Sequence, residues 1–464
     1  MNRVTRMHPL RLWRSCASAC AFAVVAVGGF AVTTEAQAPP PAVDPRIQEI
    51  VTAVSAERLE ADIRRLAGFG TRSTFSDTLS DTRGIGAARR WIKAEMDRIS
   101  ADCGGCLEVS FEGHIQTENA PQPTNVVNVV AIQRGTTHPN RYIIMSGDID
   151  SRNSNGRDGE GDAPGANDNA SGMAGVIEAA RVLSKHSFGS SIVYLGLSGE
   201  EQGLWGGAHI TQLARDQGWD IVAVLNNDMI GNIHGIDGII DNQTFRVFSE
   251  PFPPDVEAGA LRSMRFYGGE VDGPSRQIAR YVARMTEQYV PNANPMMIYR
   301  LDRFGRGGHH RPFNDLGFAG VRIMEAHENY VMQHQNIRTE NGIEYGDVIE
   351  GVDFDYAAKL TAVNAITMAG IAWGPPAPSN VRIAGAVRAS TTLSWDPVVD
   401  PGLTGYKVYW RETTAPQWKY SRFVGEVSEY TLENIIIDNY LFGVAAVGRD
   451  GNESPVVFPA VARR

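Results

Sequence analysis

Short apolar runs alternate with amphipathic segments along most of the chain. Apolar runs bounded by polar or glycine-rich segments are typical of buried strands, which we expect at 125–133, 142–146, 191–197, 221–225 and 320–324. Apolar residues at three- to four-residue spacing predict helices within 47–100 and at 172–186, 204–217, 275–289 and 354–370. This alternation predicts an α/β fold with a mostly parallel sheet covered by helices on both faces.

The pattern changes near residue 375. The proline-rich stretch 374–378 predicts a linker, and 379–464 reads as short alternating strands without a helix. The clearest strands are 392–395, 405–410 and 440–447, which favour an all-β sandwich. The aromatic residues of these strands, Trp395 among them, and the turn at 451–454 closely resemble a fibronectin type III module. We therefore predict a first domain at 47–373 and a fibronectin type III-like domain at 379–464.

The N-terminal segment has the order of a secretory signal peptide. Four arginines precede an apolar run at 17–32, and the run is followed by Ala36-Gln37-Ala38 and then prolines. This order predicts cleavage after Ala38, with 39–46 as a tether and a secreted or periplasmic location. The alternative is a membrane anchor, but the run is shorter than the ~20 residues that span a bilayer. No later segment is long and apolar enough to span one.

The composition is that of a globular protein with an acidic surplus. The 464 residues include 43 Lys plus Arg and 53 Asp plus Glu, and the formal net charge is −10. Removal of residues 1–38 takes away four Arg and one Glu, which leaves 39 basic against 52 acidic residues and a net charge of −13. A nucleic-acid partner is not expected, because binding to a phosphate backbone rests on clustered Lys and Arg.

Only Cys103 and Cys106 remain once the predicted signal peptide, with Cys16 and Cys20, is removed. In an oxidising compartment a local disulfide is the favoured state of this pair. A redox dithiol and half of a zinc site are the alternatives. No second Cys pair exists to complete a site with four thiolates.

Carboxylates follow the ends of several predicted strands. Asp148, the pair Glu200-Glu201, and Asp228 each come after an apolar run, and Asp168 lies in a turn that leads into a helix. In open α/β sheets, ligands bind outside the carboxyl ends of the strands. Clustered carboxylates repel one another and are costly to bury unless a cation compensates them. The sequence therefore predicts a metal site in this crevice, and carboxylates with an imidazole suit zinc.

Three motifs resemble those of the MH-clan metallopeptidases. They are Gly165-Ala166-Asn167-Asp168-Asn169-Ala170-Ser171-Gly172, Ser198-Gly199-Glu200-Glu201-Gln202-Gly203, and Asn227-Asp228-Met229-Ile230-Gly231. The most similar group contains aminopeptidase Y, bacterial leucyl aminopeptidases and glutamate carboxypeptidase II, and the resemblance spans 47–373. It implies a zinc exopeptidase-like fold with two zinc ions bridged by Asp168. It also implies that Glu200 is the general base, Glu201 a ligand of one metal and Asp228 a ligand of the other.

The chain departs from this family at the first ligand. The usual motif is His-x-Asp-Ser, whereas this sequence reads Asp148-Ile149-Asp150-Ser151. If Asp148 binds metal with Asp168 and Asp228, the all-oxygen set favours a harder ion such as manganese, or binds zinc weakly. Loss of that ion, which leaves one zinc, is the competing outcome. Asp150 then either orients a neighbour or is a turn residue.

The last metal ligand and the substrate contacts follow from the same resemblance. His334 is the expected imidazole ligand, with His327 as the alternative, and Tyr330 is a candidate for polarising a substrate carbonyl. The segment 306–313 matches one that lines the family's pocket, which implies substrate contacts from His310 and Phe313. The competing interpretation places Phe313 in the core and His310 on the surface.

Together these features predict an exported, metal-dependent exopeptidase acting on peptides or proteins. Aminopeptidase action is favoured by the resemblance, while Arg303, Arg306 and Arg311 leave a carboxypeptidase open, because a cation can clamp a carboxylate. A non-catalytic, receptor-like binding protein and a single-zinc acyl transferase like glutaminyl cyclase are the rival functions. The C-terminal module is compatible with attachment to a surface or polymer.

Overall fold

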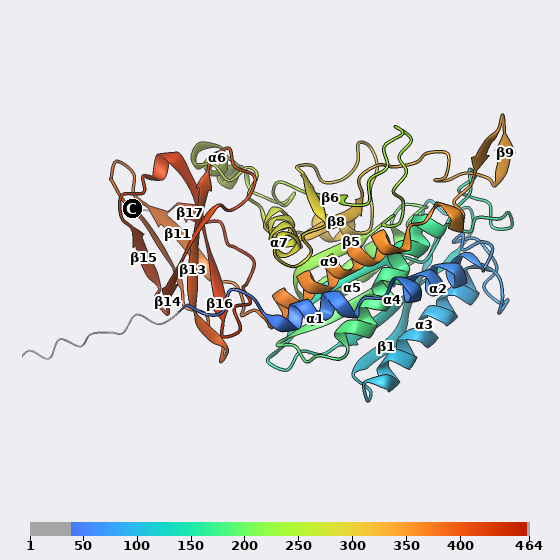
Figure 1. Ribbon diagram of the computed structural model, residues 1–464, viewed down its shortest axis with the longest axis horizontal. Helices are drawn as coiled ribbons and strands as arrows, with labels where there is room; N and C mark the ends of the chain where they lie inside the picture. The colour runs from blue at the N-terminus through green and yellow to red at the C-terminus, as the bar shows by residue number, and fades with distance from the viewer. Residues whose placement is uncertain (1–38, 462–464) are drawn as a thin grey trace, which may run out of the picture. The chain divides into compact units, whose positions relative to one another are not determined.

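The computed structural model describes residues 39–461, in nine α-helices and seventeen strands (Figure 1). The helices are α1 (Pro45–Ala53), α2 (Ala56–Ala67), α3 (Gly84–Asp102), α4 (Gly172–Leu183), α5 (Trp205–Asp216), α6 (Ala258–Tyr267), α7 (Pro274–Tyr289), α8 (His310–Asp315) and α9 (Phe354–Trp373). The predicted signal peptide at 1–38 lies outside the described residues. Between residues 39 and 461, no helix has the length and apolar content needed to cross a bilayer.

Eight strands of the described chain form one large sheet. They are β1 (Leu107–Gln116), β2 (Thr124–Gln133), β3 (His138–Asp148), β4 (Ser190–Leu197), β5 (Asp220–Asn227), β6 (Thr244–Ser249), β7 (Asn294–Ile298) and β8 (Gly320–Glu325). Their order is β1-β2-β4-β3-β5-β8-β6-β7. The central strands β4, β3, β5 and β8 are parallel, whereas β1, β2 and β6 pair antiparallel at their junctions. The predicted α/β class is confirmed, with a sheet that is mixed toward its edges.

Both faces of the sheet are covered by helices. Successive side chains of a strand point to opposite faces, so each central strand contributes apolar side chains to a core on either side. Ile143 and Met145 of β3 pack in the larger core, together with buried residues of α1, α2, α3, α4, α7 and α9. Tyr142 and Ile144 of the same strand pack on the other face with α5 and α8. A strand buried on both sides reads as a continuous apolar run, which is why the sequence pattern locates β3.

Several helices begin at residues that cap them. Asp44, Ser55 and Asp353 each accept a hydrogen bond from a backbone N–H two or three residues further on, at the starts of α1, α2 and α9. Such a cap satisfies one of the free N–H groups of the first turn. These caps fix where α1, α2 and α9 begin along the larger core.

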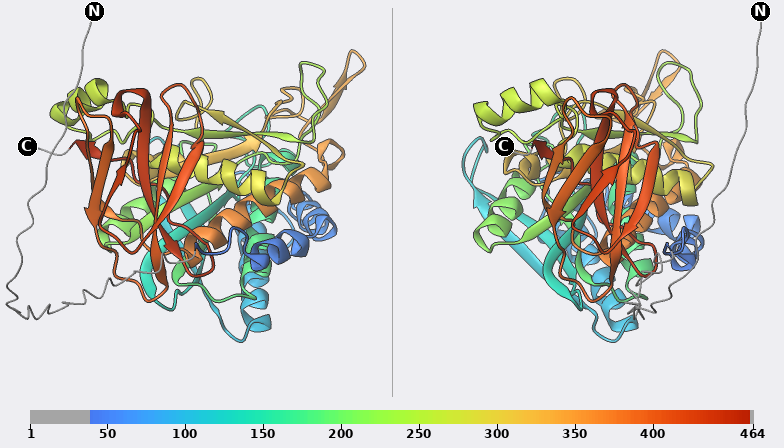
Figure 2. Two further views of the ribbon diagram at one scale, coloured as in Figure 1. Left: turned by 60° about the vertical axis from the view of Figure 1, so that its left-hand side comes forward. Right: turned by 90° about the vertical axis from the view of Figure 1, so that its left-hand side faces the viewer.

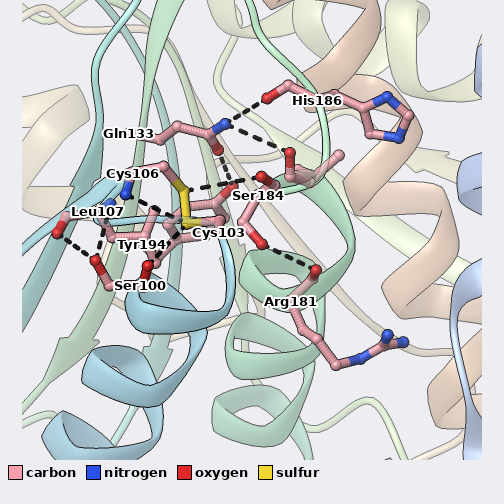
Figure 3. Close-up of a disulfide and its surroundings, with 10 residues drawn as sticks. Ser100, Cys103, Cys106, Leu107, Gln133, Arg181, Ser184, His186 and Tyr194 are labelled. Carbon is pink, nitrogen blue, oxygen red and sulfur yellow. Dashed lines mark hydrogen bonds between the residues drawn. A yellow bond between two sulfur atoms is a disulfide. The ribbon is translucent and has the colours of Figure 1, made fainter.

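Cys103 and Cys106 form a disulfide at the junction of α3 and β1 (Figure 3). The Ser100 hydroxyl, in the last turn of α3, donates to the carbonyl of Leu107 and accepts from its backbone N–H. The same junction is therefore closed both covalently and by hydrogen bonds. It joins the helix to the edge strand of the large sheet.

The C-terminal strands form two small sheets. One sheet has the order β15 (Glu429–Leu432), β12 (Thr391–Asp396), β11 (Ser379–Ala384) and β17 (Ala460–Val461), and the other β14 (Tyr420–Gly425), β13 (Leu403–Glu412) and β16 (Tyr440–Gly448). A shared core, which includes Leu393 of β12 and Val408 of β13, joins the two sheets. These strands, coloured orange to red, form one group in both views of Figure 2. The short hairpin β9 (Arg338–Glu340) and β10 (Ile343–Tyr345) stands apart from both.

Buried charges connect the C-terminal sheets to α7. Asp272, which precedes α7, lies 2.6 Å from Arg280 of α7 and 2.8 Å from Arg411 of β13, and all three side chains are almost fully buried. Nearby, Glu453 contacts Arg284 of α7 at 2.6 Å. Buried charges of this kind must be paired, because an unpartnered charge is costly out of water. The two parts are therefore held together by specific polar contacts.

We expect Asp272→Asn to lower the free energy of unfolding by about 3–5 kcal/mol, because it leaves two arginines buried beside each other without their carboxylate. Urea unfolding followed by tryptophan fluorescence measures this loss. Asp81→Asn is the matched control, because Asp81 is 91% exposed beside Arg90, and removal of an exposed pair costs only ~0–1 kcal/mol. Equal stability of the two variants would contradict the role given to Asp272.

Candidate metal centre

The carboxyl ends of three neighbouring strands meet at one edge of the large sheet. β3 pairs in parallel with β4 on one side and with β5 on the other. Asp148 ends β3, the pair Glu200-Glu201 follows β4, and Asp228 directly follows β5. A cleft of about 290 Å³ opens there. Its lining includes the acidic residues Asp168, Glu200, Glu201 and Asp228, the arginines Arg303, Arg306 and Arg311, and His334.

Asp168, Glu201 and His334 form a compact group that we call the donor cluster, with ligand atoms all within 4.8 Å of one another. The Nε2 atom of His334 lies 3.0 Å from Asp168 Oδ2 and 2.9 Å from Glu201 Oε1. One ring nitrogen carries at most one proton, so it cannot donate well to both carboxylates. Glu201 Oε1 is buried and has no hydrogen-bond partner of proper geometry. A metal ion satisfies all three groups, and one imidazole with two carboxylates is a zinc ligand set.

The loop that carries Asp168 is held in place by backbone contacts. The carboxylate of Asp347 accepts hydrogen bonds from the backbone N–H groups of Asn167 and Asp168, both at 2.7 Å. Gln333, beside His334, donates to Asp168 Oδ2 at 3.0 Å. These contacts orient two members of the donor cluster toward each other, and such outer partners tune a metal site.

Asp150 positions the loop that carries the other acidic pair. Its two carboxylate oxygens accept hydrogen bonds from the backbone N–H groups of Glu200 and Glu201, each at 3.2 Å. The Thr74 hydroxyl donates to Asp150 Oδ2, also at 3.2 Å. Asp150 therefore orients a neighbouring loop, which is one of the two roles that the sequence left open for it.

Glu200 lies in the cleft beside the donor cluster but outside it. Burial, and then the nearby carboxylates of Asp228 and Glu201, raise the pKa of Glu200 well above its usual range. A carboxylate whose pKa is raised toward neutrality can accept a proton and give it back, which is the task of a general base and acid. Position and environment therefore both suit Glu200 to proton transfer.

Asp148 is fully engaged by protein donors. Its Oδ1 lies 2.6 Å from Nδ1 of His309, and its Oδ2 accepts a hydrogen bond from the Asn169 side chain at 2.7 Å. Burial lowers the pKa of His309 to about 4, and burial also raises the pKa of Asp148 well above its usual range, so the two groups share a hydrogen bond between Nδ1 and Oδ1 rather than an ion pair. The structure therefore places Asp148 next to the acidic group but gives both of its oxygens partners.

Asp228 faces an arginine rather than the donor cluster. Its Oδ2 lies 2.7 Å from a guanidinium nitrogen of Arg322, a β8 residue that is fully buried. The other terminal nitrogen of Arg322 lies 3.2 Å from Asp302. Asp148 and Asp228 were expected to bind a second ion with Asp168. The residue set present does not fit that ion, because both oxygens of Asp148 and the Oδ2 atom of Asp228 already face a histidine, an amide and an arginine.

Comparison with known proteins places this site in a family. Residues 128–348 match the sequence model of peptidase family M28. A probable zinc metalloprotease of Leptosphaeria maculans is 41% identical over 423 residues, which cover 90% of this chain and 98% of the relative. The chain belongs to peptidase family M28. A probable zinc metalloprotease of Pyrenophora teres f. teres is 40% identical over 421 residues, 90% of this chain and 87% of the relative.

A solved structure shares the fold of this M28 peptidase. The LapA aminopeptidase of Legionella pneumophila superposes with a TM-score of 0.52 at 17% identity, over 73% of this chain and 77% of that one. This similarity supports the arrangement of sheet and helices. Zinc is the metal in the names of these two relatives, and it agrees with the nitrogen and oxygen donors of the donor cluster.

Several residues expected at the site of this M28 peptidase lie elsewhere. His310 and Phe313 are fully buried rather than on the cleft wall. His310 contacts the carbonyl of Leu301, and Phe313 packs in the core beneath α5. These two side chains hold α8 in place, so the structure corrects their expected substrate contact. Tyr330 is 54% exposed and is not part of the cleft lining.

The two histidines considered for the last metal ligand lie in different surroundings. His327 lies 2.8 Å from Asp237, a surface residue of another loop, whereas His334 is a member of the donor cluster. His309 and Arg322 are among the site residues that the sequence did not identify, together with Asn169, Gln333 and Asp347. Arg322 carried a signal, because a charged residue inside an apolar strand must find a buried partner.

Proposed function

We propose that this M28 peptidase is an exported, zinc-dependent exopeptidase that releases N-terminal residues from peptides. The observation that carries the proposal is the donor cluster with Glu200 beside it in one cleft. A metal-binding group next to a carboxylate of raised pKa is what hydrolysis of an amide requires. A receptor-like protein on the same fold has no need for this pairing. Export rests on the N-terminal sequence pattern.

The chain's own groups account for the proton transfers. A zinc ion bound by Asp168, Glu201 and His334 supplies Lewis acidity, which polarises a carbonyl and makes water more acidic. Glu200 takes one proton from the attacking water as its oxygen bonds to the carbonyl carbon. The C–N bond then breaks, and Glu200 gives the proton to the leaving amine nitrogen. Asp150 keeps Glu200 in place through the backbone of the loop.

The charges of the cleft favour a free amine near the reacting bond. Four carboxylates line the side that holds the donor cluster, and an α-ammonium group is attracted to them. The arginines line the same cleft, but Arg303 and Arg306 already contact Glu328, at 2.9 and 3.4 Å. The fold shared with the LapA aminopeptidase agrees with this direction of cleavage.

One observation favours a carboxypeptidase as the second candidate. Arg311 lines the cleft, and among the described residues no carboxylate lies within salt-bridge distance of it. Its Nε atom is buried without a hydrogen-bond partner. An unpaired guanidinium can clamp the terminal carboxylate of a peptide. The two candidates therefore differ in which end of the substrate must be free.

We expect the mature chain to hydrolyse aminoacyl p-nitroanilides and to lose this activity on exhaustive chelation, with recovery on addition of zinc. N-acetylated versions of the same substrates should be inert, because they lack the free amine that the carboxylates of the cleft attract. Release of C-terminal residues from N-acetylated dipeptides, without release from free aminoacyl substrates, would support the carboxypeptidase instead. Cyclisation of N-terminal glutamine as the main reaction would contradict both.

A further inference from the structure

The position expected for a second ion is occupied by the chain's own donors. A second ion would need free oxygens from Asp148 and Asp228 in addition to Asp168. Asp148 Oδ1 is hydrogen-bonded to His309 Nδ1 at 2.6 Å, and Asp148 Oδ2 accepts from the Asn169 side chain. The Oδ2 atom of Asp228 lies 2.7 Å from Arg322. A cation bound by Asp148 would have to displace one of these buried partners, and at Asp228 it would lie beside the guanidinium of Arg322.

Arg322 is built into this position by the fold. It lies in β8 opposite Asn226 of β5, which brings its side chain beside the residue that follows β5. Its Nη1 atom donates to Asp302 and, at 3.1 Å, to the carbonyl of Gly307, while its Nη2 atom lies 2.7 Å from Asp228. A Cβ on Gly308 would lie 2.6 Å from Asn226 Oδ1 and 3.3 Å from Asp228 Oδ2, so glycine lets this backbone close over the group.

We propose that this centre binds one zinc ion, at the donor cluster, and that the guanidinium of Arg322 supplies the positive charge of the missing second ion. His309 completes the replacement, because its Nδ1 atom lies 2.6 Å from Asp148 Oδ1 and so occupies an oxygen that a metal would use. An arginine stays charged at every accessible pH and cannot be removed by a chelator. Its fixed charge also repels a second cation, since like charges a few ångströms apart interact strongly in a buried site.

Arg322 acts here as a positioning residue. It is fully buried, so it touches Asp228 rather than the substrate. Its charge offsets the repulsion among the carboxylates that surround Glu200. The zinc ion can then be removed and restored without loss of the positive charge on this side of the cleft.

The test is the number of zinc ions bound per chain. The protein is equilibrated with excess zinc, free zinc is removed, and the bound zinc is measured by inductively coupled plasma mass spectrometry. The wild type should bind one ion. Asp228→Asn should still bind one, because Asp228 contacts Arg322 rather than metal. Glu201→Gln should lose most of the bound ion. Two ions in the wild type, none, or a loss of one ion in Asp228→Asn would overturn the proposal.

A second variant separates folding from metal binding. Arg322→Met removes the charge, and Arg322→Met with Asp228→Asn also removes the carboxylate that faces it. Asp302, the other carboxylate beside Arg322, keeps Arg303 at 3.6 Å. Circular dichroism identifies which variants fold. The folded double variant should bind one ion, as the wild type does, and a lower zinc content there would contradict the proposal. Arg322→Lys restores a positive charge that Arg322→Met lacks. A wild-type melting temperature in Arg322→Lys, with no second ion bound, supports the role of the charge.

This inference rests on the zinc centre of the proposed function but not on its substrate. One ion per chain in a protein without peptidase activity leaves the inference standing and removes the proposed function. Peptidase activity with two ions per chain does the reverse. The metal count and the hydrolysis assay are therefore read separately.

Discussion

Glu200→Gln should lower kcat/KM for aminoacyl substrates by about 10²- to 10⁴-fold, the usual contribution of a general acid and base. Glutamine has nearly the same shape as glutamate but cannot take a proton from water at neutral pH. Because Glu200 lies outside the donor cluster, its replacement should leave bound zinc unchanged. The measurement is steady-state hydrolysis together with zinc content.

The matched control is the neighbouring change, Glu201→Gln. Glu201 belongs to the donor cluster, so this variant should lose activity together with zinc. The two adjacent residues thus separate proton transfer from metal binding. A Glu200→Gln variant with full activity, or one that loses its zinc, would contradict the role given to Glu200.

His334→Ala is expected to produce the largest loss of zinc affinity. His334 is the one imidazole of the donor cluster, and its Nε2 atom lies within 3.0 Å of both carboxylates. Loss of an outer partner of a metal ligand costs about 10- to 100-fold in affinity. Removal of the ligand itself should cost more than that. Competition with a chromophoric chelator measures the dissociation constant of zinc, and hydrolysis should fall with occupancy.

His327→Ala is the matched control for this prediction. It removes a histidine from the same loop, but one that contacts Asp237 near the surface. Zinc affinity and activity should stay within about 2-fold of the wild type, since substitutions away from special features change little. If His327→Ala lost zinc and His334→Ala kept it, the assignment of the last ligand would be reversed.

The central strands were predictable because they are buried on both faces. β3, β4, β5 and β8 read as continuous apolar runs, and the predicted and observed ranges overlap throughout. β1 was missed because its burial alternates with exposure along a sheet edge. β7 begins Asn294-Pro295 and is only half-buried, a composition that argues against a strand. Edge strands owe their pairing to neighbours that local sequence does not reveal.

The acidic residues of the site were predictable from their positions after the strands. Their partners were not, because each partner comes from a distant part of the chain. Asp148 meets His309 across 161 residues, and Asp228 meets Arg322 from the next strand of the sheet. The sequence left open whether the site binds one ion or two. Only the geometry of these contacts gives a physical reason to prefer a single ion.

The most direct test of the zinc centre is an anomalous difference map, recorded above the zinc absorption edge from crystals of the mature chain. We predict one strong peak per chain, in contact with Asp168, Glu201 and His334, and a guanidinium beside Asp228. A peak between Asp148 and Asp228, or no peak at the donor cluster, would contradict it.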